Sequence, residues 1–264
     1  YECCAYSGEN QTEIHAFTTE SVYQIPNSGF EIFSNTESTK YYSFYNPASS
    51  VVENRTKWWC SGNKGSTTVG TSYTITNPDQ QDKMEGNYSV KLESKYVIIK
   101  FAAGNIFSGE FVRVIGTSGG VVNFGRPFTL RPRKLSLWLK YQNGPIDRFN
   151  GAPDNGSVKE GDMDRCQVFV ALGDWDYRTY GGTPESPVQV NTTDRSTFFK
   201  SDSEAVIGYG AYVGDKATDG WIKVEIPIEY VSVSRKPTHI IVSCAASMYG
   251  DYFTGSTSSI LWID

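Results

Sequence analysis

The chain has 264 residues, with 24 basic and 29 acidic side chains and a formal net charge of −5. Glycine (25 residues), tyrosine (17) and phenylalanine (14) are abundant, which is typical of a folded chain and excludes a disordered tail, a collagen or a coiled coil. The mild acidity and the scattered basic residues argue against nucleic acid as a partner. No apolar run is long enough to form a transmembrane segment.

The first residues differ in character from the rest. Residues 1–26 are polar and mixed, and the turn-forming run Pro26-Asn27-Ser28-Gly29 follows them. We interpret residues 1–26 as a linker or the tail of a preceding domain, and residues 27–264 as one domain. All-β folds often reach this length as a single domain.

A period of two dominates the remaining chain. Apolar and more polar residues alternate over 135–141 and 221–228, which gives a strand two different faces. Runs rich in β-branched and aromatic residues predict further strands at 89–94, 97–101, 111–115, 167–172, 206–213, 239–245 and 260–263. The best helical candidate, 196–204, is short and has no clear apolar stripe. Residues 142–161, rich in Gly, Asn and Asp, are expected to form a surface loop. Many strands and very little helix predict an all-β sandwich or barrel.

The five cysteines do not form a disulfide framework. Their number is odd, and no pair has the C-x-x-C spacing. Cys166 and Cys244 lie in predicted strands, where a thiol acts as a small hydrophobic group. With only His15 and His239 in the chain, a zinc site is not expected.

Six segments together resemble one family. They are 59–63 (WCSGN), 86–92 (GNYSVKL), 101–111 (FAAGNIFSGEF), 125–128 (GRPF), 236–242 (KPTHIIV) and 249–256 (YGDYFTGS). Over about residues 27–264 the chain resembles the putative carbohydrate metabolism domain family, whose members are bacterial surface or periplasmic lipoproteins. The resemblance implies a β-jelly-roll of two antiparallel sheets, similar to carbohydrate-binding modules. It also implies a location at the bacterial cell surface or in the periplasm, a lipid anchor outside this chain, and other surface glycan-uptake proteins as partners.

A structural calcium ion is a further implication of this resemblance. Jelly-roll carbohydrate modules often carry one between the first strand, a turn and the last strand. By that resemblance Glu31, Asp264 and a carbonyl near Asn87 are the candidate ligands, and calcium takes such oxygen ligands. The sequence contains no dense D-x-D-x-D loop to support the site, so ordinary surface carboxylates are the competing interpretation.

Two loops combine aromatic rings with carboxylates, the side chains that stack on sugars and bind their hydroxyl groups. The first follows the strand predicted at 167–172 and contributes Asp174, Trp175 and Tyr177. The second is 249–256, with candidate ligand-binding residues Tyr249, Asp251, Tyr252 and Phe253. Each ring could instead close one end of a hydrophobic core.

The sequence therefore predicts a non-catalytic domain that binds an oligosaccharide or polysaccharide. One alternative is a glycoside hydrolase, which needs paired carboxylates. The acids available for it are Asp174, Asp176, Asp251 and Glu225, and none lies in a motif specific to hydrolases. A structural or adhesive surface module, whose aromatic residues only pack, is the second alternative.

Overall fold

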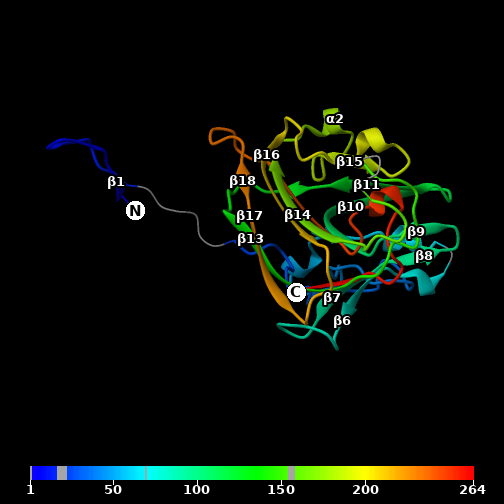
Figure 1. Ribbon diagram of the computed structural model, residues 1–264. Helices are drawn as coiled ribbons and strands as arrows, with labels where there is room; N and C mark the ends of the chain where they lie inside the picture. Colours follow the sequence, from blue (N-terminus) through cyan, green and yellow to red (C-terminus); the bar gives the residue numbers. More distant parts are fainter. Residues whose placement is uncertain (1, 17–22, 69, 154–157) are drawn as a thin grey trace.

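The computed structural model describes residues 2–16, 23–68, 70–153 and 158–264. Two antiparallel sheets pack face to face as a sandwich (Figure 1). The larger sheet has nine strands in the order β15-β11-β10-β19-β14-β16-β18, with β5 beside β10 and β12 beside β19. The smaller has five strands, in the order β17-β13-β20-β7-β6. The expected all-β sandwich is confirmed.

The nine strands of the larger sheet lie far apart along the chain, between residues 59 and 245. They are β5 (Trp59–Cys60), β10 (Asn105–Ile115), β11 (Gly119–Phe124), β12 (Arg126–Pro127), β14 (Cys166–Gly173), β15 (Val188–Asn191), β16 (Val206–Gly214), β18 (Glu229–Tyr230) and β19 (His239–Ala245). The five strands of the smaller sheet are β6 (Thr76–Asp79), β7 (Ser89–Glu93), β13 (Lys134–Gln142), β17 (Ile222–Pro227) and β20 (Ile260–Ile263).

Helices are short in the described residues. The two α-helices, α1 (Asn63–Ser66) and α2 (Tyr177–Tyr180), have four residues each. The 3-10 turns are η1 (Glu53–Arg55), η2 (Thr71–Tyr73), η3 (Arg195–Thr197) and η4 (Gly250–Tyr252). None of these helices is long and apolar enough to cross a membrane.

Strand β14 shows how the alternating sequence builds the sandwich. Val168, Val170 and Leu172 enter the main core between the two sheets, together with Leu139, Val90 and Leu261 of the smaller sheet. Successive side chains of a strand point to opposite faces, so Phe169 and Ala171 lie on the other face, in a second cluster. The strand is therefore buried on both faces, and its outer face can form the floor of a site.

The buried thiols behave as expected. Cys166 on β14 and Cys244 on β19 are almost completely buried in the main core. Burial raises the pKa of both thiols to about 12, so they stay protonated and pack as small apolar groups.

Two predictions of local structure were wrong. Residues 97–101 are not one strand but part of a hairpin of β8 (Lys95–Val97) and β9 (Lys100–Ala102), which turns at Ile98 and Ile99. Ile98 has a φ of 54°, a strained conformation for a β-branched residue, and no Gly or Asn marks the turn. The helix predicted at 196–204 is reduced to the end of η3 followed by turns.

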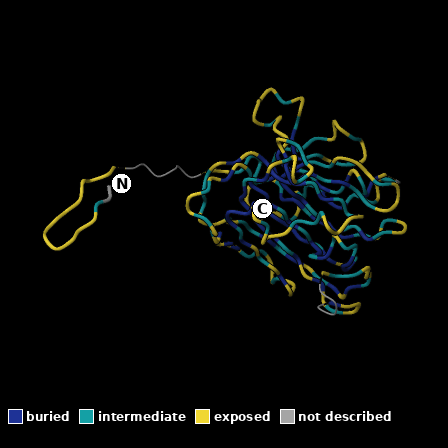
Figure 2. Tube along the Cα trace, turned by 90° about the horizontal axis from the view of Figure 1, so that it is seen from above, coloured by how far each residue is buried: buried dark blue, intermediate teal, exposed yellow. Residues whose placement is uncertain are grey.

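The N-terminal segment forms two small ladders. Strand β1 (Glu2–Cys3) pairs with β4 (His15–Ala16), and β2 (Tyr6–Ser7) pairs with β3 (Asn10–Gln11). Residues 5–16 are exposed, in contrast to the buried interior of the sandwich (Figure 2). The boundary expected near residue 26 stays a prediction.

Candidate functional site

The outer face of the nine-stranded sheet carries a cavity of about 450 Å³, which we call the sheet-face cavity. Its floor consists of side chains from β10, β11, β14, β16 and β19, among them Asn105, Phe107, Val122, Gln167, Phe169, Tyr209 and Ser243. Its walls come from α1, the β8–β9 hairpin, the loop after η3 and the 247–253 segment. A rigid sheet thus presents the floor, and loops enclose it.

Aromatic rings make up much of the lining. Phe169 on β14 stacks on Phe199 with a ring-centroid distance of 5.1 Å and an interplanar angle of 10°. The Tyr209 ring lies 6.1 Å from Phe169 and tilts toward it. Elsewhere in the lining, the Lys100 ammonium lies 4.3 Å from the ring centroid of Phe253. These rings give the cavity broad apolar surfaces.

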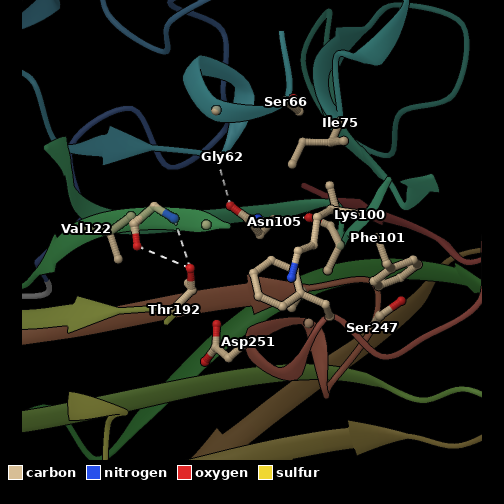
Figure 3. A pocket seen from close by; sticks show the side chains of 18 of the residues that line it. Gly62, Ser66, Ile75, Lys100, Phe101, Asn105, Val122, Thr192, Ser247 and Asp251 are labelled. Atoms are coloured by element: carbon tan, nitrogen blue, oxygen red, sulfur yellow. Dashed lines mark hydrogen bonds between the residues drawn. The ribbon is translucent and has the colours of Figure 1, made fainter. Parts of the chain in front are cut away.

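Two polar residues of the lining are held in place by the backbone around them. The side-chain amide of Asn105 accepts a hydrogen bond from the N–H of Gly62 at 2.9 Å and donates to the carbonyl of Ala103 at 2.8 Å. The hydroxyl of Thr192 accepts from the N–H of Gly120 at 2.9 Å. Figure 3 shows Asn105, Thr192, Lys100 and Asp251 around one space.

Several other polar side chains of the cavity have no hydrogen-bond partner within the described part of the chain. Three of them are the carboxylate of Asp251, the amide of Gln167 and the hydroxyl of Tyr209. Polar groups in an apolar setting are normally paired. These three are therefore available to a ligand.

The environment of Asp251 changes its acidity. Solvent reaches the residue, but the surrounding protein displaces much of the water that would hydrate the carboxylate. This desolvation raises the pKa of Asp251 to about 6. The group is consequently part protonated near neutral pH and can donate as well as accept a hydrogen bond.

The predicted 249–256 loop contributes two residues to the cavity. Asp251 in η4 and Phe253 line it, whereas Tyr249 is buried in a separate small cluster with Ile146 and Val158. The Tyr252 ring packs edge-on against Phe198 at 5.2 Å. The loop reaches its place because Gly250 lies against Ala103, where a β-carbon would come within 2.4 Å of another side chain.

The predicted 174–177 loop does not line the cavity. Trp175 is 3% exposed and packs 6.3 Å from Phe199, so it lies behind the wall that Phe199 forms. Asp174 forms an ion pair with Arg235, and Tyr177 is a half-buried residue of α2 with Arg178 over its ring. Contrary to the expected stacking role, Trp175 is a core residue.

The acids considered for hydrolysis are not brought together. Asp176 accepts a hydrogen bond from the N–H of Arg178 and caps α2. Glu225 pairs with Lys134 at 2.6 Å on the five-stranded sheet. Of the four candidates, Asp251 alone lines the sheet-face cavity, among the lining residues that the structure describes.

The residues proposed for calcium meet at one turn. Glu31 accepts hydrogen bonds from the N–H groups of Asn87 at 2.6 Å and Tyr88 at 3.1 Å, and Asp264 accepts from Met84 and Glu85 at 2.7 and 2.8 Å. Three of the four carboxylate oxygens already accept hydrogen bonds, so few of their lone pairs are left for a cation. No group of three or more His, Cys, Asp or Glu residues within the described ranges could hold a metal ion. The arrangement therefore does not fit calcium.

Several residues of the cavity were not anticipated, chiefly Lys100, Asn105, Gln167, Phe199 and Tyr209. One signal was present for Gln167, which is polar within a strand that is otherwise apolar on both faces. Nothing local marks Phe199 or Tyr209. Tyr209 reaches Phe169 through the pairing of β14 with β16, and Phe199 reaches it from the loop after η3.

Together the fold and the cavity define a β-sandwich domain with an aromatic-lined site on one sheet face. The chain matches the putative carbohydrate metabolism domain family over residues 29–264 and belongs to that family. Comparison with curated proteins finds no match.

Two solved structures share the fold. A putative glycoside hydrolase from Bacteroides thetaiotaomicron aligns with a TM-score of 0.67 and 20% identity, over 90% of this chain and 68% of that one. A putative glycoside hydrolase from Bacteroides vulgatus aligns with a TM-score of 0.58 and 19% identity, over 85% of this chain and 89% of that one. At this identity the likeness establishes the fold and not the reaction.

Proposed function

We propose that the domain binds a glycan in the sheet-face cavity without cleaving it. The observation that carries this proposal is the set of unpartnered polar groups, Asp251, Gln167 and Tyr209, in a cavity walled by aromatic rings. Sugars offer apolar C–H faces to rings and hydroxyl groups to carboxylates and amides. The cavity volume of about 450 Å³ lies in the range of small-ligand sites. Membership in a carbohydrate-related family supports the same ligand class.

The charge distribution of the cavity favours binding over hydrolysis. Most glycosidases use two carboxyl groups, roughly 5–9.5 Å apart, on either side of the scissile bond. Within the described lining of the sheet-face cavity, Asp251 is the sole carboxylate. A second acid of the kind that mechanism needs is therefore missing from the described lining.

Hydrolysis is the second candidate function, and one observation favours it. The pKa of Asp251, raised to about 6, resembles that of a general acid, which must be protonated near neutral pH. The two functions differ in whether sugar is released. With either function, we propose that the protein is located at the bacterial surface or in the periplasm. There it would be anchored by lipid and act beside other glycan-uptake proteins.

A glycan array followed by calorimetric titration of the best ligand tests binding, and a reducing-sugar assay on the same ligand tests cleavage. We expect saturable binding and no release of reducing ends. Asp251→Asn and Gln167→Ala should each weaken binding about tenfold, because each removes a hydrogen bond in a largely apolar site.

Asp219→Asn is the matched control, since it removes an exposed acid outside the cavity. Its affinity should equal that of the unmodified chain. Equal affinities for all three folded variants would overturn the sheet-face site. Release of sugar that disappears in Asp251→Asn would replace the binding function with hydrolysis.

A further inference from the structure

A second cavity, of about 240 Å³, adjoins the first, and we call it the Arg126 cavity. Phe111 lines both cavities, and α1 contributes Gly65 to the sheet-face cavity and Lys64 to the Arg126 cavity. The rings of Tyr41, Tyr42 and Trp59 form part of its lining. Unlike its neighbour, this cavity is rich in charged groups.

Arg126 is the central feature of the second cavity. It is 8% exposed, and all the groups that it bonds are neutral: the carbonyl of Trp58 at 3.2 Å, the hydroxyl of Ser186 at 2.8 Å and the carbonyl of Gly109. Among the described residues, no ion pair includes Arg126. A guanidinium has five N–H donors, so these three bonds leave donors to spare. Glu110 and Glu185 attract the guanidinium from a distance, and neither forms an ion pair with it. A buried cation without a directly bonded anion is costly, and a bound anion would offset that cost.

The other charges of the cavity do not cancel that of Arg126. Glu37 forms an ion pair with Lys57 and also accepts a hydrogen bond from Ser43 at 2.7 Å. Glu110 accepts hydrogen bonds from Asn123 at 3.0 Å and Thr183 at 3.3 Å. Lys64 is exposed and has no partner within the described residues. Counted over the lining residues alone, three cationic and two anionic side chains leave one positive charge in excess, on a chain whose formal net charge is −5.

We infer that the Arg126 cavity binds the carboxylate of an acidic sugar unit, a uronic acid residue of the glycan. This inference rests on the proposed glycan-binding function and narrows its ligand to acidic glycans. A single carboxylate matches the single excess charge, and Arg126 and Lys64 supply donors for it. The tyrosine and tryptophan rings offer surface to the sugar that bears the carboxylate. A neutral part of the same glycan occupies the sheet-face cavity across Phe111.

The test compares methyl β-glucuronide with methyl β-glucoside, two probes that differ in the carboxylate. Binding is followed by amide chemical shifts of Lys64 and Gly109 during titration. We expect the glucuronide to bind more tightly, and its affinity to fall as salt concentration rises. Lys64→Gln should weaken glucuronide binding about threefold, the size typical of an exposed charge pair.

Glu37→Gln should change the glucuronide affinity in the opposite direction to Lys64→Gln. It keeps the shape of the side chain, removes one negative charge and frees Lys57, so glucuronide binding should strengthen about threefold. A merely structural effect would not reverse sign between these two variants. Lys83→Gln, which removes an exposed lysine outside both cavities, is the control and should bind as the unmodified chain does.

Each outcome separates this inference from the proposed function. Equal binding of the two glycosides, or shifts of the same sign in both variants, would overturn the acidic-sugar site, while the sheet-face proposal would stand if neutral oligosaccharides still bind there. Glucuronide binding without any neutral glycan would instead retain the Arg126 site and overturn the sheet-face proposal. Tighter binding of a sulfated methyl glycoside or of free acetate than of the glucuronide would overturn the assignment to a uronic acid.

Discussion

Asp251 lies on the wall of the sheet-face cavity, where protein atoms replace part of its hydration and no described residue pairs with it. Its pKa in the folded chain is about 6, against roughly 3.9 for an aspartate in an unfolded chain. Folding thus favours the protonated form. The stability that this preference contributes is fully present below about pH 4 and is lost as the pH rises through about 6.

Asp251→Asn should remove this pH dependence, because asparagine does not titrate. The difference in melting temperature, Asp251→Asn minus unmodified, should therefore become more positive from pH 4 to pH 7. Thermal unfolding of both proteins at these two pH values measures the change. A constant difference would show that Asp251 has an ordinary pKa in the folded chain.

Trp175 contributes to the stability of the fold through its burial, and it does not contact the ligand. Trp175→Ala should lower the free energy of unfolding by about 3–5 kcal/mol, because a large buried ring leaves a cavity behind. Glycan affinity per folded molecule should stay the same. Denaturant unfolding and calorimetric titration of one preparation measure both quantities.

Tyr177→Ala is the comparison for this substitution, since Tyr177 comes from the same loop and is half-buried. This substitution should lower the free energy of unfolding by about 1 kcal/mol. A Trp175→Ala protein that keeps its stability but loses affinity would contradict the core assignment and restore the stacking role.

At the scale of elements, Asp164 ties the segment before β14 to the loop between β19 and β20. The carboxylate is fully buried and accepts hydrogen bonds from Ser247 at 2.6 Å, Ser259 at 2.7 Å and the N–H of Ser256 at 2.8 Å. Ser247 also lines the sheet-face cavity. The network thus fixes the loop that carries Asp251.

Asp164→Ala should destabilise the fold by about 3 kcal/mol or more, because it leaves several buried donors without an acceptor. Asp215→Ala, at an exposed position in the loop between β16 and β17, should have little effect. Chemical denaturation measures both. If Asp164→Ala cost no more than Asp215→Ala, the network would not be what holds this loop.

At the scale of the whole molecule, the beginning and end of the sandwich are joined at the turn of residues 84–88. Glu31 and Asp264, far apart in sequence, both accept hydrogen bonds from N–H groups of this turn. Through Asp264, which follows β20, the contacts tie the end of the five-stranded sheet to this turn.

Excess chelator should therefore leave the melting temperature unchanged, because a metal ion stabilises a protein only where the folded state binds it. Thermal unfolding with and without EDTA, and again with added Ca²⁺, tests this expectation. A lower melting temperature in EDTA that Ca²⁺ restores would show that Glu31 and Asp264 rearrange around a metal ion.

The amino-acid sequence by itself determined the sandwich. Period-two alternation is a local property, and it located β13, β14, β16, β17, β19 and β20 to within a residue or two of their bounds. The combination of aromatic residues and a carboxylate in the 249–256 loop is also a local pattern, and it pointed to Asp251. Where the local signal was absent, as at the Ile98 turn, the prediction was wrong, because the chain reverses at β-branched residues that ordinarily favour extended strands.

Only the tertiary structure decided which aromatic residues face a ligand. Trp175 and Phe253 share a sequence signature, a ring within two residues of an aspartate in a loop after a strand. Trp175 is nevertheless buried behind Phe199, whereas Phe253 lines the cavity. The Arg126 cavity likewise gathers Glu37, Lys64 and Arg126 from separate parts of the chain. Side-chain burial and charge balance depend on neighbours that strand pairing brings together over long sequence distances, and no local pattern encodes those neighbours.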